Sequence, residues 1–355
     1  MSTLAQLLKQ NRLERDLKLT DVSGALKIDN ALVSKIERGD RFATKKQIEA
    51  FIEFYKLDKK AIITQWLSEK ILEELKYEEY ALDVLYAAEE KIKYGLETTD
   101  EVKFDAEVTA LLQKIDALKA QYNVLKPLDG VQLQKMQEYF NINYTFESNR
   151  IEGNTLTLQE THLVINEGLT IGGKSMHEHL EAINHADAID FIGDLVRKKE
   201  PFTERILKEI HYLVLKGIDR KNAGVYRTVS VMISGSKHKP PEAILIAKKM
   251  EEIFEFYEKN KTNLHPVLMA AAMHEKIVTV HPFVDGNGRT TRLVMNLILL
   301  MHGFTIANIK GDLSSRKEYY NALEIAQTRG ITTSFDILVC RSLLDSLKEH
   351  IDLAK

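Results

Sequence analysis

The chain of 355 residues has only one cysteine, six prolines and a formal net charge of −3. A single cysteine, Cys340, can build neither a disulfide framework nor a CxxC metal site, so we expect an inert, buried thiol. Apolar runs such as 297–301 are far shorter than the ~20 residues of a membrane span, and the charged first residues do not resemble a secretory signal. We therefore expect a cytoplasmic protein that makes no membrane contact.

Breaks in the helical pattern are few, and apolar residues recur mostly at the 3.6-residue spacing of helices. This pattern predicts an all-α fold. The length suits about two or three domains, and Pro127 and Gly130 mark one boundary. We expect three parts, which cover residues 1–58, 59–125 and 126–355.

The first part, residues 1–58, resembles the helix-turn-helix domains of phage repressors in its stretch LTDVSGALKIDNALVSKIERG. In that family the third helix enters the major groove of DNA. Two positions differ from the family pattern, because Ser23 replaces a small alanine and Lys27 replaces the glycine of the turn. The resemblance implies that one face of the third helix contacts DNA through Asn30, Ala31, Ser34 and Lys35.

The charge of the N-terminal region agrees with an anionic partner. Residues 1–60 hold 13 lysines and arginines against 9 aspartates and glutamates, which gives a net charge of +4. A helical bundle that binds another protein fits the same pattern. DNA and protein are therefore both candidate partners of this part.

The second part, residues 59–125, is expected to be helical and is highly charged. From Val108 to Leu125 an apolar residue recurs every three or four positions, over about two and a half heptads, which is too short to establish a coiled coil. This stripe fits a spacer or a contact in a homo-oligomer, and it fits equally a face that packs on the following domain.

The strongest candidate for a functional site is the stretch HPFVDGNGRTTR at 281–292, which we call the motif loop. Pro282 disfavours the helical conformation at His281, so the helix before the loop should end there. Gly286 and Gly288 lack side chains, and their backbone N–H groups can converge on an anion. A helix that begins at Arg289, after the turn PFVDGNG, adds unpaired N–H donors and the positive end of its dipole.

Side chains of the motif loop supply charge and a titratable group. Arg289 and Arg292, the motif arginines, share one face of the first helical turn and can hold a polyphosphate. Asp285 supplies a carboxylate that suits Mg²⁺ next to phosphate oxygens. His281 titrates near neutrality and can take a proton from a hydroxyl, while Phe283 should point inward. The loop therefore predicts a site for nucleotide phosphates.

The motif loop matches every defining position of the HxFx(D/E)GNGRxxR motif, and residues of about 125–340 resemble the Fic family. Similar proteins are adenylyltransferases, which move AMP from ATP to a protein hydroxyl. The resemblance implies His281 as general base and Asp285 as ligand of Mg²⁺. It implies phosphate binding by five further residues: Gly286, Asn287, Gly288, Arg289 and Arg292. Relatives with lysine at the place of Gly288 transfer phosphate instead, so glycine favours AMP transfer.

Two other segments carry the same resemblance. AGVYRTVSVMISG resembles the family's segment that ends in a β-hairpin flap, and the alternating TVSVMISG by itself predicts a short hairpin. SSRKEYYNALEIAQ resembles a later segment whose paired tyrosines flank the adenine. The resemblance places six residues in the nucleotide site: Val231, Met232, Ile233, Ser234, Tyr319 and Tyr320.

The stretch SNRIEG at 148–153 fits the (S/T)xxxE(G/N) motif of the family's inhibitory helix. Glu152 could pair with Arg292 in a bidentate contact and so take the guanidinium that the γ-phosphate of ATP needs. Ser148, one turn earlier, would fix the helix by hydrogen bonding. The resemblance therefore implies an adenylyltransferase that inhibits itself through Glu152 and Ser148.

Two other functions fit the same sequence. One is a DNA-binding transcription regulator whose Fic domain senses nucleotide, although a pure sensor needs no base such as His281. The other is a toxin-like modifier of an essential enzyme, for which an inhibitory segment in the same chain is less expected. A target hydroxyl on another protein and one on the chain itself both fit, as does later removal of AMP.

Overall fold

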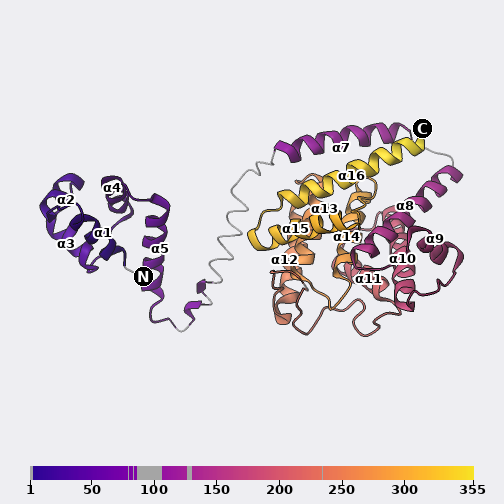
Figure 1. Ribbon diagram of the computed structural model, residues 1–355, viewed down its shortest axis with the longest axis horizontal. Coiled ribbons are helices and arrows are strands. Elements are labelled where there is room, and N and C mark those ends of the chain that lie inside the picture. Colours follow the sequence, from indigo (N-terminus) through magenta and orange to yellow (C-terminus); the bar gives the residue numbers. More distant parts are fainter. Residues whose placement is uncertain (1–2, 79, 83, 86–105, 126–129, 234) are drawn as a thin grey trace. The chain divides into compact units, whose positions relative to one another are not determined.

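The computed structural model describes residues 3–78, 80–82, 84–85, 106–125, 130–233 and 235–355 (Figure 1). These residues form helices and loops, and no strand occurs among them, which confirms the predicted all-α fold. The chain divides into two compact units, Met1–Lys103 and Phe104–Lys355.

The first unit is a bundle of short helices around one apolar core. Leu8, Val22 and Phe51 are fully buried in this core. Trp66 is buried as well, and its indole N–H donates to the carbonyl oxygen of Ala43 at 2.9 Å, so the fifth helix packs on the first four. The helices are α1 Leu4–Leu13, α2 Leu19–Leu26, α3 Asn30–Arg38, α4 Lys45–Tyr55 and α5 Lys59–Leu75.

The two departures from the repressor pattern lie within α2, at Ser23, and directly after it, at Lys27. Lys27 ends α2 in the left-handed conformation with φ 55°, at the position where the family has glycine. The Ser23 hydroxyl donates to the carbonyl oxygen of Ile28 at 2.6 Å. Asp29 then caps α3 by accepting from the N–H groups of Ala31 and Leu32, and Gly39 ends it with φ 80°.

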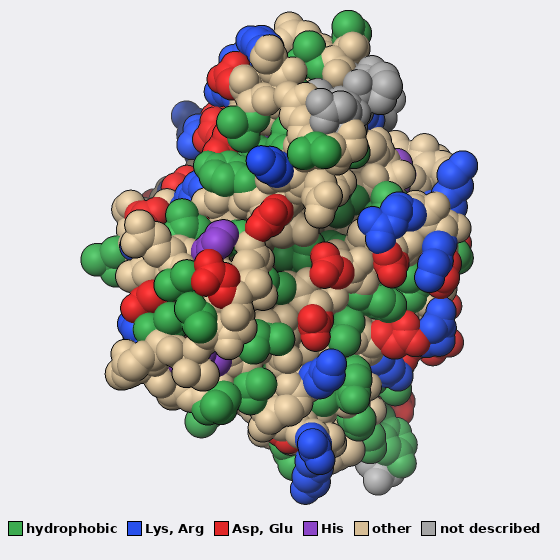
Figure 2. Space-filling view, turned by 90° about the vertical axis from the view of Figure 1, so that its right-hand side faces the viewer, with side chains coloured by type: hydrophobic (Ala, Val, Ile, Leu, Met, Phe, Trp, Pro, Cys, Tyr) green, Lys and Arg blue, Asp and Glu red, His purple; other side chains and the backbone are tan. Residues whose placement is uncertain are grey.

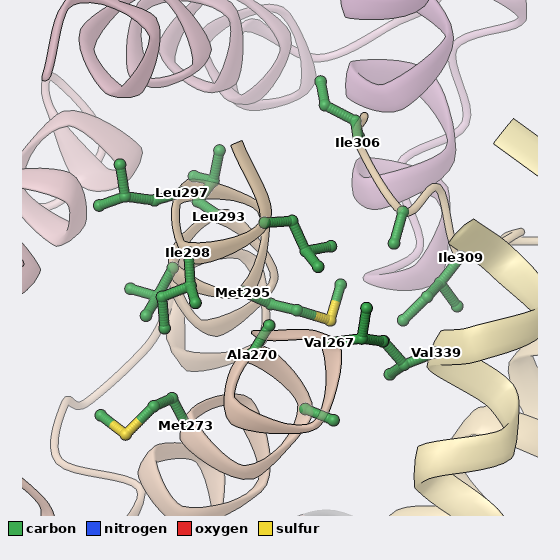
Figure 3. Close-up of a cluster of buried hydrophobic side chains, with 14 of the residues drawn as sticks. Val267, Ala270, Met273, Leu293, Met295, Leu297, Ile298, Ile306, Ile309 and Val339 are labelled. Carbon is green, nitrogen blue, oxygen red and sulfur yellow. The ribbon is translucent and has the colours of Figure 1, made fainter. Parts of the chain in front are cut away.

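The second unit is a larger helical domain. The central pair is α13 and α14, whose facing side chains, including Ala270 and Met295, interlock in Figure 3. Val339 of α16 completes this part of the core. The helices are α7 Ala106–Val124, α8 Gly130–Ile151, α9 Leu158–Glu167, α10 Met176–Lys198, α11 Glu204–Leu215, the 3₁₀ turn η1 Ala243–Leu245, α12 Ile246–Asn260, α13 Pro266–Val280, α14 Asn287–Met301, α15 Leu313–Arg329 and α16 Thr333–Ala354.

The apolar stripe of α7 packs inside this unit. Val108, Ile115 and Tyr122 are buried in the core of the second unit, and α7 lies along α16 (Figure 1). Of the two interpretations of the stripe, the observed packing corresponds to a face covered by the following domain. In the part of the chain that the structure describes, no helix is both long and apolar enough to cross a membrane.

The predicted β-hairpin flap is wrong for the described residues of 225–242, which we call the flap segment. They form loops and turns without a strand, and Ser234 lies outside the described residues. Met232 is 95% exposed and Val229 is 55% exposed, so the alternating pattern does not bury one face as a strand of a sheet would. Side-chain hydrogen bonds hold the segment instead, mainly those of Arg227 and one from His238 Nε2 to the carbonyl oxygen of Thr279 at 2.8 Å.

Candidate active site

The motif loop joins α13 to α14, the two central helices of the second unit. Helix α13 ends at Val280, and His281 follows it in the left-handed conformation with φ 51° and ψ 58°. Proline at position 282 excludes the right-handed helical conformation before it, so the chain must leave the helix here. Gly286, with φ 73°, precedes the first residue of α14. The end of α13 falls where the sequence predicts it, and α14 begins at Asn287, two residues before the predicted start.

Asn287 and Phe283 hold the motif loop in shape. The Asn287 side-chain amide donates to the carbonyl oxygen of Phe283 at 2.9 Å and accepts from its N–H at 3.0 Å. Phe283 is 1% exposed, as its predicted inward orientation requires, and its ring stacks on His211 with centroids 3.6 Å apart. Asn287 therefore braces the loop with its side chain, and its contribution to an anion site would come from its backbone N–H.

His211, on α11, contacts the motif loop, and we did not predict this role from the sequence. Its Nδ1 accepts from the N–H of Gly224 at 2.8 Å, so its Nε2 carries the proton and donates to the carbonyl oxygen of Asp285 at 2.9 Å. Burial lowers the pKa of His211 to about 4. The neutral ring thus links α11 to Gly224, just before the flap segment, and to the motif loop. His211 lies 74 positions before Asp285, and no pattern in the sequence around it indicates a contact with the motif loop.

His281 is oriented as a proton acceptor. Its Nδ1 donates to the carbonyl oxygen of Val278 at 3.3 Å, because a carbonyl can only accept. The other ring nitrogen, Nε2, then carries the lone pair. Burial and, secondarily, the nearby charge of Arg227 lower the pKa of His281, although its contact with the Val278 carbonyl opposes this. The ring is therefore neutral at pH 7, which is the form that a general base requires.

Arg227 is a buried hub that the sequence did not single out. It is 3% exposed, and its backbone N–H donates to the carbonyl oxygen of Pro282 at 2.9 Å. Its side chain donates to the carbonyl oxygens of His281 at 2.8 Å, Val229 at 2.9 Å and Pro241 at 2.6 Å. One side chain thus fixes both sides of the flap segment and the residue that carries the proposed base.

Arg292 is buried and makes four hydrogen bonds to the side chains and backbone around it. Its Nε donates to the Ser148 hydroxyl at 3.1 Å, and NH2 donates to the Ser148 carbonyl oxygen at 2.9 Å. NH2 also donates to Glu152 Oε1 at 2.7 Å, and NH1 donates to the Tyr319 hydroxyl at 3.3 Å. Burial alone would lower the pKa of Arg292, but the carboxylate of Glu152 outweighs it and the pKa is raised. The structure therefore brings Ser148, Glu152 and Arg292 together, through one oxygen of Glu152 rather than in the bidentate contact expected.

Gly288 faces this pair. A Cβ atom at position 288 would clash with Glu152 Oε1 and would lie 3.1 Å from Arg292 NH1. The missing side chain thus leaves the space that the Glu152 carboxylate fills. The same space, at the first turn of α14, is where the backbone N–H groups of the motif loop would meet a phosphate.

Arg289 and Asp285 are the other two charged side chains of the motif loop. Arg289 NH1 lies 2.7 Å from Glu181 Oε1, and NH2 lies 3.7 Å from Asp285 Oδ2. The Asp285 side chain is 60% exposed. Within the described residues, no group of three or more His, Cys, Asp or Glu could hold a metal ion. A cation at Asp285 would take most of its ligands from phosphates and water, and this coordination suits Mg²⁺.

The remaining residues predicted to contact the nucleotide differ in their exposure to solvent. Tyr319 is 1% exposed and lies behind Arg292, with its hydroxyl also 3.1 Å from His274 Nε2. Tyr320 is 42% exposed and donates to the carbonyl oxygen of Ile151, the last residue of α8. In the flap segment, Met232 is exposed, and Val231 and Ile233 are half-buried.

The predicted DNA contacts share one face of α3 in the first unit. Asn30, Ala31 and Lys35 are exposed and Ser34 is half-buried. Val33, on the opposite face, lies in the core of the unit. The face is thus open to a partner, as the repressor pattern requires.

Family models match both units. Residues 201–299 match the model described as Fic/DOC family, and residues 3–61 match the model described as a helix-turn-helix domain. The chain carries a Fic/DOC domain. The motif loop lies within the residues that match, and the helix-turn-helix match covers α1–α4.

The Fic domain is similar to proteins named protein adenylyltransferase Fic. The protein of Nematostella vectensis is 34% identical over 218 residues, which are 61% of this chain and 50% of that protein. The protein of Drosophila grimshawi is 33% identical over 269 residues, which are 76% of this chain and 52% of that protein. The chain thus spans about half the length of these curated relatives.

Solved structures agree with the Fic fold. A Fic domain-containing signalling protein from Bacteroides thetaiotaomicron has a TM-score of 0.62 at 26% identity, over 68% of this chain and 97% of that chain. A fragment of Fic-1 from Caenorhabditis elegans has a TM-score of 0.62 at 24% identity, over 94% of this chain and 96% of that chain, and this likeness concerns the fold alone.

Proposed function

We propose that the chain is a protein adenylyltransferase, which transfers AMP from ATP to a serine, threonine or tyrosine hydroxyl of a protein. The observation that carries the proposal is the motif loop, where His281 is held as a neutral proton acceptor next to a glycine-lined helix start and two arginines. The similar proteins of Nematostella vectensis and Drosophila grimshawi bear the name of this activity, which supports it.

The proposed reaction is attack of a hydroxyl oxygen on the α-phosphorus of ATP. Nε2 of His281 takes the hydroxyl proton, the new oxygen–phosphorus bond forms, and the bond to the bridging oxygen of the β-phosphate breaks. Pyrophosphate leaves, and Arg289 and Arg292 neutralise its growing charge. Bound Mg²⁺, with Asp285 as its protein ligand, would neutralise further charge on the leaving phosphates.

We further propose that the Glu152–Arg292 pair, which we call the inhibitory contact, keeps the enzyme inactive. The carboxylate of Glu152 takes up a donor of Arg292 and the space beside Gly288. The γ-phosphate of ATP needs that same guanidinium, so the carboxylate and the phosphate exclude one another. Ser148 keeps the end of α8 in register by accepting from Arg292.

Incubation with ATP labelled at the α-phosphate tests the proposal in three proteins. The wild type should retain little label, Glu152→Gly should retain much more, and the double variant Glu152→Gly, His281→Ala should retain almost none. Loss of a general base typically costs ~10²–10⁴ in rate. Equal labelling of the last two proteins would refute the base, and a Glu152→Gly variant no more active than wild type would refute the inhibitory contact.

DNA binding by the first unit is a second candidate function, favoured by the exposed face of α3. We propose that Asn30, Ala31, Ser34 and Lys35 contact DNA. Fluorescence anisotropy with a labelled duplex of mixed sequence should give an affinity that falls steeply with salt, and Lys35→Ala should weaken it. Binding unaffected by salt would contradict contact with DNA phosphates.

The same titration in the presence of ATP separates this enzyme from a regulator that senses nucleotide. A sensor requires that ATP change the affinity for DNA. An adenylyltransferase that carries a helix-turn-helix domain requires no such change and does require labelled protein.

A further inference from the structure

Glu181 of α10 links a motif arginine to the segment that carries Glu152. It is 8% exposed, and each of its carboxylate oxygens has a different partner. Oε1 accepts from Arg289 NH1 at 2.7 Å, and Oε2 accepts from Asn154 Nδ2 at 2.9 Å. The carbonyl oxygen of Glu181 also accepts from Asn149 Nδ2 at 3.3 Å. Asn149 and Asn154 stand on either side of Glu152 in the sequence.

Asn154 makes several further hydrogen bonds besides the one to Glu181. Its backbone N–H donates to the carbonyl oxygen of Asn149 at 3.1 Å, and its Oδ1 accepts from the N–H of Leu156 at 3.0 Å. Its Nδ2 donates also to the carbonyl oxygen of Glu178 at 3.1 Å. The turn after α8, which presents Glu152, is therefore anchored to α10 through one asparagine side chain.

Arg289 depends on Glu181 for its charge balance. Arg289 is 3% exposed, and its other carboxylate neighbour, Asp285, is farther away at 3.7 Å and largely open to solvent. A buried guanidinium without its carboxylate is strongly unfavourable. Glu181 is thus expected to stay with Arg289, whereas the bond to Asn154 is the one that can open when Glu152 moves.

We propose that Glu181 is a positioning residue that couples the inhibitory contact to Arg289. Through Asn154 it holds the turn that keeps Glu152 on Arg292. Through its other oxygen it orients Arg289 for the β- and γ-phosphates. Both motif arginines are then tied to one turn, Arg292 directly by Glu152 and Arg289 through Glu181. The inference rests on the proposed nucleotide site and adds a residue to it.

Asn154→Asp tests the first half of the coupling. Aspartate has the same shape but places an oxygen against Glu181 Oε2, so the turn should loosen. In the otherwise wild-type chain we expect AMP transfer and ATP affinity to rise at least about three- to tenfold, because the loss of even one of the two hydrogen bonds of Asn154 Nδ2 is worth about that factor. In the Glu152→Gly background the same change should have no effect, because no inhibitory contact is left to release.

Glu181→Gln in the Glu152→Gly background tests the second half. Glutamine keeps the shape and removes the charge that orients Arg289. The Kd and KM of ATP should rise at least fivefold, while the affinity for AMP, which lacks the β- and γ-phosphates, should change less than twofold. Glu209→Gln on α11 is the matched control, since that exposed carboxylate pairs with the exposed Arg205, and it should change neither.

Three results would overturn the coupling. Asn154→Asp could leave transfer and ATP affinity unchanged in the wild-type background, or change them equally in both backgrounds. Glu181→Gln could weaken ATP and AMP equally, which would indicate general damage to the fold. If Glu152→Gly transfers no label at all, the proposed function fails by itself, and the ATP and AMP affinities of the same variants still decide the coupling.

Discussion

At the scale of single residues, Arg227 shows how the site depends on a side chain that touches no substrate. It reaches His281 from 54 positions earlier and bonds only carbonyl oxygens in this region. Burial lowers the pKa of Arg227, since no carboxylate partner compensates for the lost water. The fork of five donors in a guanidinium suits this arrangement, and a lysine ammonium does not reproduce it.

Arg227→Lys should therefore impair the proposed chemistry more than nucleotide binding. In the Glu152→Gly background we expect kcat to fall at least about tenfold, or ~1.4 kcal/mol in the barrier, with a smaller change in the KM of ATP. Initial rates of AMP transfer measure this. Arg220→Lys, at an exposed arginine nearby, is the control. Equal kcat values for both variants would refute a positioning role for Arg227.

Gly288 offers a test of the inhibitory contact that needs no activity. Gly288→Ala brings a methyl group against Glu152 Oε1, so it should destabilise the chain by about 1–3 kcal/mol. In the Glu152→Gly background only the closer approach to Arg292 NH1 remains, so the penalty should be much smaller. Thermal denaturation of the four proteins gives this double-mutant cycle. The same loss of stability in both backgrounds would mean that Glu152 does not occupy this space.

From the local sequence we could predict only some of the residues of the site. The motif loop and the SNRIEG stretch were readable because their residues are neighbours in sequence, and the contact of Glu152 with Arg292 followed from the family resemblance. Arg227, His211 and Glu181 were missed, because each meets the loop only in the folded chain and lies in a segment without a distinctive local pattern.

At the scale of secondary structure, helix boundaries followed from local chemistry and the flap segment did not. Alternating residues favour a strand only when a neighbouring strand and a buried face are present. The described flap residues have neither, and Arg227 replaces the hydrogen bonds that a hairpin would supply. The end of α3 at Gly39 was predictable, because glycine readily takes the left-handed conformation that closes a helix.

The left-handed conformation of Lys27, directly after α2, can be tested by substitution. Lys27 has a φ of 55°, which a residue with a Cβ adopts at a cost and glycine adopts freely. Lys27→Gly should raise the free energy of unfolding of the first unit by about 0.5–1 kcal/mol. Gly39→Ala, at φ 80°, should lower it by a similar amount. Chemical denaturation followed through Trp66 measures both, and a less stable Lys27→Gly variant would contradict the account.

At the scale of the whole molecule, one face mixes charges of both signs and the interior of the second unit holds several neutral histidines. The face in Figure 2 mixes acidic and basic side chains rather than presenting one sign. Burial lowers the pKa of His211 to about 4 and lowers the pKa values of His185 and His274 well below 6.5. Below pH ~6.5 the unfolded chain binds a proton at each of these three rings, whereas the folded chain keeps them neutral until the pH approaches their lowered pKa values.

Stability should therefore fall as the solution becomes acidic. The histidines contribute fully above pH ~6.5, where neither state binds the proton, and the contribution is lost as pH falls from there toward the folded pKa. Each should cost ~1.4 kcal/mol per pH unit in this window. Urea denaturation at pH 7.5 and pH 5 checks this, and His211→Gln, which does not titrate, should reduce the difference. A midpoint that does not change with pH would contradict neutral burial.

The proposed reaction depends on which bond of ATP the motif loop exposes to a hydroxyl. The most direct measurement compares Glu152→Gly incubated in parallel with ATP labelled at the α-phosphate and with ATP labelled at the γ-phosphate. The account predicts that protein retains the α-label and not the γ-label, because AMP is transferred and pyrophosphate leaves. Retention of the γ-label, or of neither label, would contradict it.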